Sequence, residues 1–135
     1  MSPEYEIKKD ICLRYLDGRD HKYIIPENEV DVDDLIVALK DDDSLRFSFS
    51  EQSQEWRDSY YDETDITADW SRHYESKSVA KELLNGKWVG YTYWYGGGKH
   101  REPEAIPWMN EAYFLGYEEK IITKKYFHQL HENVL

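Results

Sequence analysis

The sequence predicts an α+β domain with a largely antiparallel sheet of six or seven strands and one or two short helices. Two observations lead to this fold class. Several segments alternate apolar and polar side chains or are rich in aromatic residues, above all the segment 88–95 (WVGYTYWY). Asp-Gly and Asn-Gly pairs, which are typical of tight hairpin turns, separate such segments. The length of 135 residues suits one domain, and we therefore expect a single acidic domain over residues 1–135.

The charge of the chain is unevenly distributed. The net charge is −11, and the stretch 27–69 alone holds fifteen acidic residues against three basic ones. Aromatic residues make up 16% of the chain, which argues against a disordered acidic protein. The single cysteine, Cys12, excludes a disulfide within the chain and fits a buried position in a reducing compartment. The sequence shows neither a leader-like segment nor a membrane-spanning apolar run, so we expect a soluble, cytoplasmic protein.

Residues 5–25 are predicted to form a β-hairpin. The apolar residues of YEIKKDICLRYL stand at mostly even spacing, as in a strand with one buried face. Asp17-Gly18 supplies the positive φ of a tight turn. Pro26 then ends the second strand, because proline has no N–H to donate to a ladder.

Residues 32–40 are predicted to form a short helix. Asp31 or Asp33 can cap it, and acidic side chains near its beginning meet the positive end of the helix dipole. Leu35, Ile36 and Leu39 form an apolar stripe at helical spacing.

The next two segments differ in the clarity of their pattern. Residues 44–50 (SLRFSFS) alternate apolar and polar side chains, which predicts a half-buried strand. Residues 51–75 follow neither the helical nor the strand period, although they contain several aromatic side chains. We expect this segment to be irregular and to carry a broken strand.

The segment 76–86 allows two interpretations. It can be a short helix capped by Ser76 or Ser78 and ended by Asn85-Gly86. The same Asn-Gly pair can instead turn a hairpin into the strand 88–95, and we favour this interpretation because that strand is the strongest β signal. Both of its faces are aromatic, which suits a central strand covered on both sides, or one with an exposed stacking surface. One face carries Trp88, Gly90, Thr92 and Trp94, and the other Val89, Tyr91, Tyr93 and Tyr95.

The remaining segments are predicted to complete the sheet. Three glycines follow the strand, and Pro103 and Pro107 prevent a regular ladder in the loop after them. Residues 108–117 and 121–130 are predicted to be strands, with a turn at 118–120.

The acidic stretch holds the residues that we expect to bind a partner. Its carboxylates are interleaved with aromatic side chains, so they can present a negative field with Trp56 and Tyr60 as anchors. The alternative to partner binding is that the acidic residues only keep the protein soluble. The candidate partner-binding residues are Asp41, Asp42, Asp43, Glu55, Trp56, Asp58, Tyr60, Asp62, Glu63 and Asp65.

A second candidate site is the glycine-rich loop. Its backbone N–H groups and basic side chains suit an anion or another ligand. The loop matches neither the P-loop nor the dinucleotide-binding pattern, so a flexible turn is the alternative. Its residues are Gly96, Gly97, Gly98, Lys99, His100 and Arg101.

The other motifs do not assemble a catalytic or metal site. His128 and His131 are spaced i, i+3, but structural zinc needs more ligands and Cys12 is the only thiol. The acidic clusters lack the order of an EF-hand loop. We therefore expect no metal, no cofactor and no catalytic residues. Direct binding to nucleic acid is not expected either, because the acidic surface would repel phosphates.

The run from Tyr91 to Lys120 joins an aromatic strand, a Gly-rich loop and a segment with Glu-Pro. In this order of features the chain resembles uncharacterised small acidic proteins encoded by phages and prophages of enteric bacteria. The resemblance covers about a quarter of the chain. It implies a bacterial host cell, in which such proteins inhibit host defence or redirect host enzymes.

Three functional hypotheses follow. The leading one is a non-enzymatic phage-type accessory protein that binds a basic host protein through its acidic face, as a DNA mimic or another inhibitor. The second is an immunity protein that neutralises a basic nuclease toxin. The third is a small ligand-binding domain or enzyme that uses the Gly96 to Arg101 loop beside the aromatic strand. A homodimer through an exposed aromatic face is a further expectation.

Overall fold

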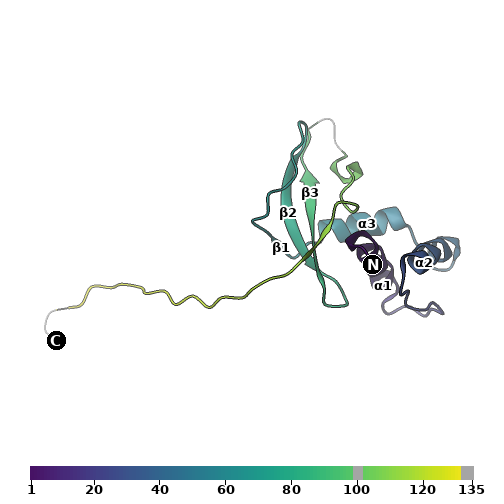
Figure 1. The fold of residues 1–135 in the computed structure, drawn as a ribbon, viewed down its shortest axis with the longest axis horizontal. Helices are drawn as coiled ribbons and strands as arrows, with labels where there is room; N and C mark the ends of the chain where they lie inside the picture. Colours follow the sequence, from purple (N-terminus) through teal and green to yellow (C-terminus); the bar gives the residue numbers. More distant parts are fainter. Residues whose placement is uncertain (99–101, 132–135) are drawn as a thin grey trace.

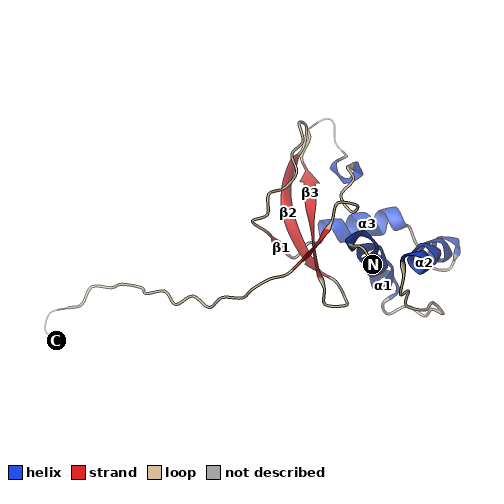
Figure 2. Ribbon diagram, in the orientation of Figure 1, coloured by secondary structure: helices blue, strands red, loops and turns tan. Residues whose placement is uncertain are grey.

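The structure is a computed structural model that describes residues 1–98 and 102–131. In these residues three α-helices and a short 3-10 helix, η1 (Pro103–Ala105), accompany an antiparallel sheet with the strand order β1-β2-β3-β4 (Figure 1). Two of the helices lie against one face of the sheet, and an extended segment leaves the sheet after the last strand (Figure 2). The α+β class and the antiparallel sheet are confirmed. The prediction of six or seven strands is wrong, since the described residues form four.

The first element, α1, is a helix over Pro3–Leu16. The predicted hairpin over 5–25 is therefore wrong. The Ser2 side chain accepts a hydrogen bond from the N–H of Tyr5, and proline occupies the first helical turn, which is a strong helix start. Gly18, at φ 73°, follows the end of the helix and does not turn a hairpin. The buried side chains of α1 fit a helical face: Glu6, Ile7, Asp10, Ile11, Cys12 and Leu16.

The second helix, α2, spans Glu29–Asp41 and confirms the prediction for 32–40. It begins three residues earlier than expected, because the side chain of Asn28 caps it by accepting from the N–H of Asp31 at 2.9 Å. Its apolar stripe packs against α1 on the side away from the sheet (Figure 1).

The third helix, α3, spans Phe49–Asp58, where we predicted a strand over 44–50 and an irregular segment from 51. The strand prediction is wrong. Ser48 caps the helix by accepting from the N–H of Glu51 at 3.3 Å, and Ser-x-x-Glu is the sequence of a capping box. Phe47 contributes to the alternating apolar pattern of 44–50 but belongs to no strand. It lies before the helix, buried against the ring of Tyr15.

The sheet is built around one hairpin, whose strands are β2 (Glu75–Glu82) and β3 (Trp88–Tyr95). This confirms the hairpin interpretation of 76–95 and its turn at Asn85-Gly86. Gly86 has a φ of 87°, which only glycine adopts without strain. Lys81 pairs with Val89 across the hairpin, so the side chains of both point to the face that carries the helices.

Two short strands flank the hairpin. β1 (Asp62–Glu63) pairs with β2, and β4 (Tyr113–Leu115) pairs with β3, which makes β3 a central strand. Gly90 on β3 lets β4 come close, because a Cβ there would stand 2.4 Å from the ring of Tyr113. The predicted strand 108–117 is therefore much shorter. The predicted strand 121–130 is wrong: residues 116–131 are extended but pair with no described strand.

The core consists of two clusters. The first lies between the sheet and helices α1 and α3, and its centre is the stacked pair of Trp56 and Trp108 with Tyr91 beside it. The second lies between α1 and α2 and includes Cys12 and Phe47. Burial raises the pKa of the Cys12 thiol to about 12, as expected for an inert core cysteine.

One buried carboxylate connects α1, α3 and the hairpin. Asp10 is 3% exposed. Its Oδ2 accepts from Arg14 Nε at 2.5 Å and from the indole N–H of Trp56 at 2.8 Å. Its Oδ1 accepts from the N–H of Leu84 at 2.8 Å. All three bonds are charge-assisted, and three elements depend on one side chain for them.

Lys81 is also buried, at 2% exposure, on the same face of the sheet. Its Nζ donates to the carbonyl of Trp56 at 3.0 Å and to the Ser59 hydroxyl at 2.6 Å. Burial, with a smaller effect from the charge of Arg14, lowers the pKa of the Lys81 amine to about 8.

We predict that Asp10→Ala lowers the free energy of unfolding by about 3 kcal/mol or more. It leaves the Nε–H of Arg14, the indole N–H of Trp56 and the N–H of Leu84 without their acceptor. Urea unfolding measures the change. Asp20→Ala, which removes an exposed carboxylate, is the control and should change the value by less than about 0.5 kcal/mol. Equal effects of the two substitutions would contradict the role of Asp10.

We also predict a stability that depends on pH through Lys81. Its pKa is lower in the folded protein than the ordinary 10.5, so the unfolded chain binds more protons between the two values. The free energy of unfolding therefore rises with pH in that window. Relative to Lys81→Met, the wild type should gain on the order of 1–2 kcal/mol between about pH 7.5 and 9.5.

Denaturant unfolding of both proteins at the two pH values checks this. The comparison with Lys81→Met is needed because the Cys12 thiol, with its raised pKa, acts in the opposite direction in both proteins. A difference between the two proteins that stays constant with pH would show that Lys81 does not titrate in this range.

Candidate functional site

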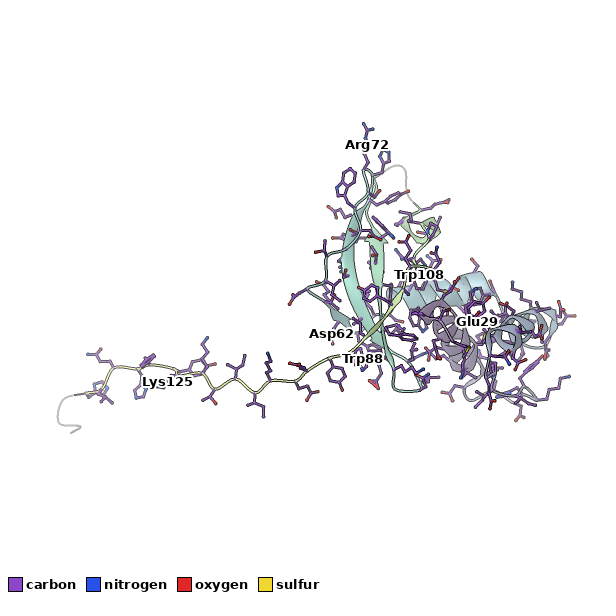
Figure 3. All side chains as sticks on the ribbon, viewed as in Figure 1. Glu29, Asp62, Arg72, Trp88, Trp108 and Lys125 are labelled. Atoms are coloured by element: carbon purple, nitrogen blue, oxygen red, sulfur yellow. The ribbon has the colours of Figure 1, made fainter. Side chains whose placement is uncertain are left out.

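A groove of about 770 Å³ lies on the sheet face that α1 and α3 leave uncovered. Directly opposite residues of paired strands share a face, and the pairs Asp62–Ala80, Glu82–Trp88 and Trp88–Leu115 place these side chains on the groove side. One wall comes from residues 62–66 and the other from residues 115–119. In Figure 3 the labelled Asp62 and Trp88 lie together at this end of the sheet, where the extended segment leaves it.

The groove is strongly acidic. Its lining contains six acidic residues and no lysine or arginine, and the acidic residues are Asp62, Glu63, Asp65, Glu82, Glu118 and Glu119. Glu63 pairs with Val79, so it lies at the rim and its carboxylate meets Lys77. Lys77 lies 2.9 Å from Glu63, and contacts with Tyr60 and Glu63 raise the pKa of its amine. Lys120 approaches Glu118 at 4.0 Å. The other four carboxylates form no ion pair with a described residue, so the groove keeps most of its negative charge.

Aromatic rings lie beside these carboxylates. Trp88 is half-buried and makes edge-to-face contacts with Tyr61, at 5.9 Å between ring centroids, and with Tyr117, at 5.6 Å. Tyr61 and Tyr117 are themselves exposed, at 50% and 67%. Rings next to carboxylates are an arrangement that attracts lysine and arginine side chains, by cation–π contact as well as by charge.

The structure brings together only part of the predicted partner-binding set. Asp62, Glu63 and Asp65 line the groove. Asp58 lies on the other side of the sheet, where it contacts Arg57 at 2.7 Å and accepts from the hydroxyl of Tyr93 at 3.1 Å. Tyr60 is on that side too, packed against the ring of Tyr93.

Glu55 and Trp56 lie elsewhere again. Both line a smaller cavity of about 160 Å³ next to Lys81. Trp56 is 4% exposed and donates to Asp10, so the prediction that it is a surface anchor is wrong. The even mixture of aromatic and acidic residues in the sequence does not distinguish a core tryptophan from an exposed one.

Asp41, Asp42 and Asp43 lie at the end of α2, which packs on α1 away from the sheet. Asp42 accepts from the hydroxyls of Ser44, at 2.6 Å, and Tyr23, at 2.9 Å, and these bonds lower the pKa of its carboxyl. The acidic stretch therefore does not form one face. Its acidic residues are divided among α2 and its end, helix α3 and the groove.

The glycine-rich loop is described only in part. Gly96, Gly97 and Gly98 all have positive φ, whereas Lys99, His100 and Arg101 lie outside the described residues. The third hypothesis combines this loop with Tyr91, Tyr93 and Trp94 on the strand before it, and two of these three rings are buried. Tyr91 is fully buried and donates to the carbonyl of Arg57, and Trp94 is 5% exposed.

Half of the acidic residues of the groove lie outside the set predicted from the sequence. Glu82 was detectable, because alternation along 79–82 gives it the face opposite to Val79. The alternation of residues 88–95 predicts the strand face of Trp88, but it does not indicate that this ring belongs to a binding site. Glu118 and Glu119 were interpreted as a turn, and only the pairing of β4 with β3 brings them to the groove.

Two further findings concern the described part of the chain. None of its helices is both long enough and apolar enough to cross a membrane. Residues 1–98 and 102–131 contain no group of three His, Cys, Asp or Glu side chains placed to hold a metal ion. The groove can act through charge and aromatic contact, which suits binding of a cationic group.

Comparison of the chain with protein-family models, with curated proteins and with solved structures finds no match in any of the three.

Proposed function

We propose that this chain is a non-enzymatic binding protein whose acidic groove takes a basic segment of another protein. The observation that supports the proposal is that six acidic residues line one groove together with Trp88 and Tyr117. Its volume of about 770 Å³ accommodates a few side chains of an extended peptide.

The chemistry of the groove favours arginine and lysine. The aliphatic part of either side chain can lie on the ring of Trp88 while its charged end meets Asp62, Asp65 or Glu82. The remaining negative charge of the protein accelerates the encounter with a basic partner. Such an interaction is screened by salt, because the carboxylates that lie on the groove walls are exposed.

The division of the acidic residues favours a peptide-sized contact over a mimic of duplex DNA. The phosphates of DNA form a continuous array, whereas the carboxylates of α2 and of the groove belong to separate parts of this molecule. A basic segment can belong to a host nucleic-acid enzyme or to a nuclease toxin. The phage-type inhibitor and the immunity protein are therefore two versions of the same proposal, with different partners.

We predict that a fluorescent peptide with alternating arginine and leucine residues binds the protein at low salt and more weakly as salt increases. The variant Asp62→Asn/Asp65→Asn/Glu82→Gln should bind at least about tenfold more weakly, since it removes three charges from the groove. Fluorescence anisotropy measures both effects.

A matched variant tests whether the groove or only the net charge is responsible. Asp34→Asn/Asp41→Asn/Asp43→Asn removes the same number of exposed charges from α2 and its end. It should weaken binding by less than about threefold, because these charges act only at long range. Equal losses in the two triple variants would show that the peptide responds to overall charge, and would refute the groove as the site.

A further inference from the structure

The open edge of β4 continues into the tail, by which we mean residues 116–131. β4 is the last strand of the order β1-β2-β3-β4, so the backbone groups on its outer side face no described strand. The tail extends from it away from the helices (Figure 1). Its apolar side chains are strongly exposed, with Ile121 at 100%, Phe127 at 92% and Ile122 at 85%. An extended segment with exposed backbone and apolar side chains is a template for pairing with another chain.

The sequence of the tail indicates what that chain is. Residues 117–126 read YEEKIITKKY, so two glutamates precede a central pair of isoleucines and two lysines follow it. When such a segment runs antiparallel to a copy of itself, glutamates meet lysines at both ends. The segment is thus complementary to itself.

Symmetry restricts the register of such a pair. In two identical antiparallel strands related by a twofold axis, one residue faces its own copy. With Ile121 on the axis, Glu118 faces Lys124 of a second copy and Leu115 faces Phe127 of that copy. Glu119 and Lys125 of the second copy are diagonal neighbours on one face, within reach of long side chains. Each of these contacts occurs twice.

Neighbouring symmetric registers are worse. With Ile122 on the axis, Lys120 faces Lys124 of the second copy, and with Lys120 on the axis two copies of this lysine face each other. Like charges directly opposite destabilise a strand pair. The charge pattern therefore selects the register centred on Ile121.

We propose that two copies of this chain pair through residues 113–129 as antiparallel strands across a twofold axis at Ile121. The tail of each copy then adds a strand beside β4 of the other, and the two sheets become continuous. This interface pairs the open edge of β4 and brings the exposed apolar side chains of the tail beside those of the second copy. It differs from the aromatic face of β3 that we expected. The pairing shares Glu118 and Glu119 with one wall of the groove, but it does not require that the groove binds a basic peptide.

Charge exchange tests the proposal. In analytical ultracentrifugation the wild type should have twice the chain mass of 16.2 kDa at a protein concentration of about 100 μM. Glu118→Lys/Glu119→Lys and Lys124→Glu/Lys125→Glu place like charges opposite each other, and each should weaken the dimer at least about tenfold. An equimolar mixture of the two variants should form a heterodimer. The variant with all four substitutions, which keeps the net charge of the wild type, should form a homodimer again.

Crosslinking tests the register independently of affinity. Ile121→Cys places two thiols across the axis at strand-pair distance, so oxidation should join two chains by a disulfide. In the Thr123→Cys variant each new cysteine faces residue 119 of the second copy, four residues from the cysteine of that copy. The two cysteines are then about 13 Å apart and should not crosslink. Cys12 is buried and does not compete.

The substituted side chains are exposed, so circular dichroism should show an unchanged fold in every variant. A monomeric wild type at the highest concentration would overturn the proposal, whatever else the tail binds. Equal crosslinking of the Ile121→Cys and Thr123→Cys variants would overturn it as well.

Discussion

The carboxylate of Asp10 is the interaction on which the arrangement of this domain depends. It receives hydrogen bonds from α1, α3 and the turn between β2 and β3, three regions that are far apart in the sequence. Lys81 supports the same junction by donating to the last turn of α3. Because both groups hold the helices to one face of the sheet, the opposite face stays free. The groove exists on that face as a consequence, and its acidic walls need no role in stability.

Local signals in the sequence predicted the elements that local interactions determine. The hairpin of β2 and β3 follows from Asn85-Gly86 between two strand-like segments, and α2 follows from its apolar stripe. The apolar spacing of α1 is ambiguous, because Ile7 and Ile11 fit both the helical and the strand period, whereas the Ser2-Pro3 start specifies a helix. α3 was missed for a similar reason, since its capping box lies inside an alternating segment. In both cases a cap carried more information than the apolar spacing.

The site was predictable only in its contiguous part. Asp62, Glu63 and Asp65 are neighbours in the sequence and were recognised together. Glu82, Trp88 and Glu118 come from three other segments, and strand pairing alone brings them to the groove. The acidic residues of the stretch 27–69 have different roles: Glu29 and Asp31 favour the start of α2, whereas Asp62, Glu63 and Asp65 line the groove. The tail is mixed in charge, with Lys120, Lys124 and Lys125 close to Glu118 and Glu119.

The two core clusters also differ in how they can form. The cluster around α2 joins segments that are close in sequence, between α1 and Phe47. The cluster beneath the sheet joins α1 to strands more than 70 residues away. Phe49 packs against both clusters and is the side chain that couples them. If that coupling is weak, α2 opens and recloses as a separate cooperative unit while the sheet and α3 remain folded. Its amide hydrogens then exchange with solvent through partial unfolding, and those of β3 only through unfolding of the whole domain.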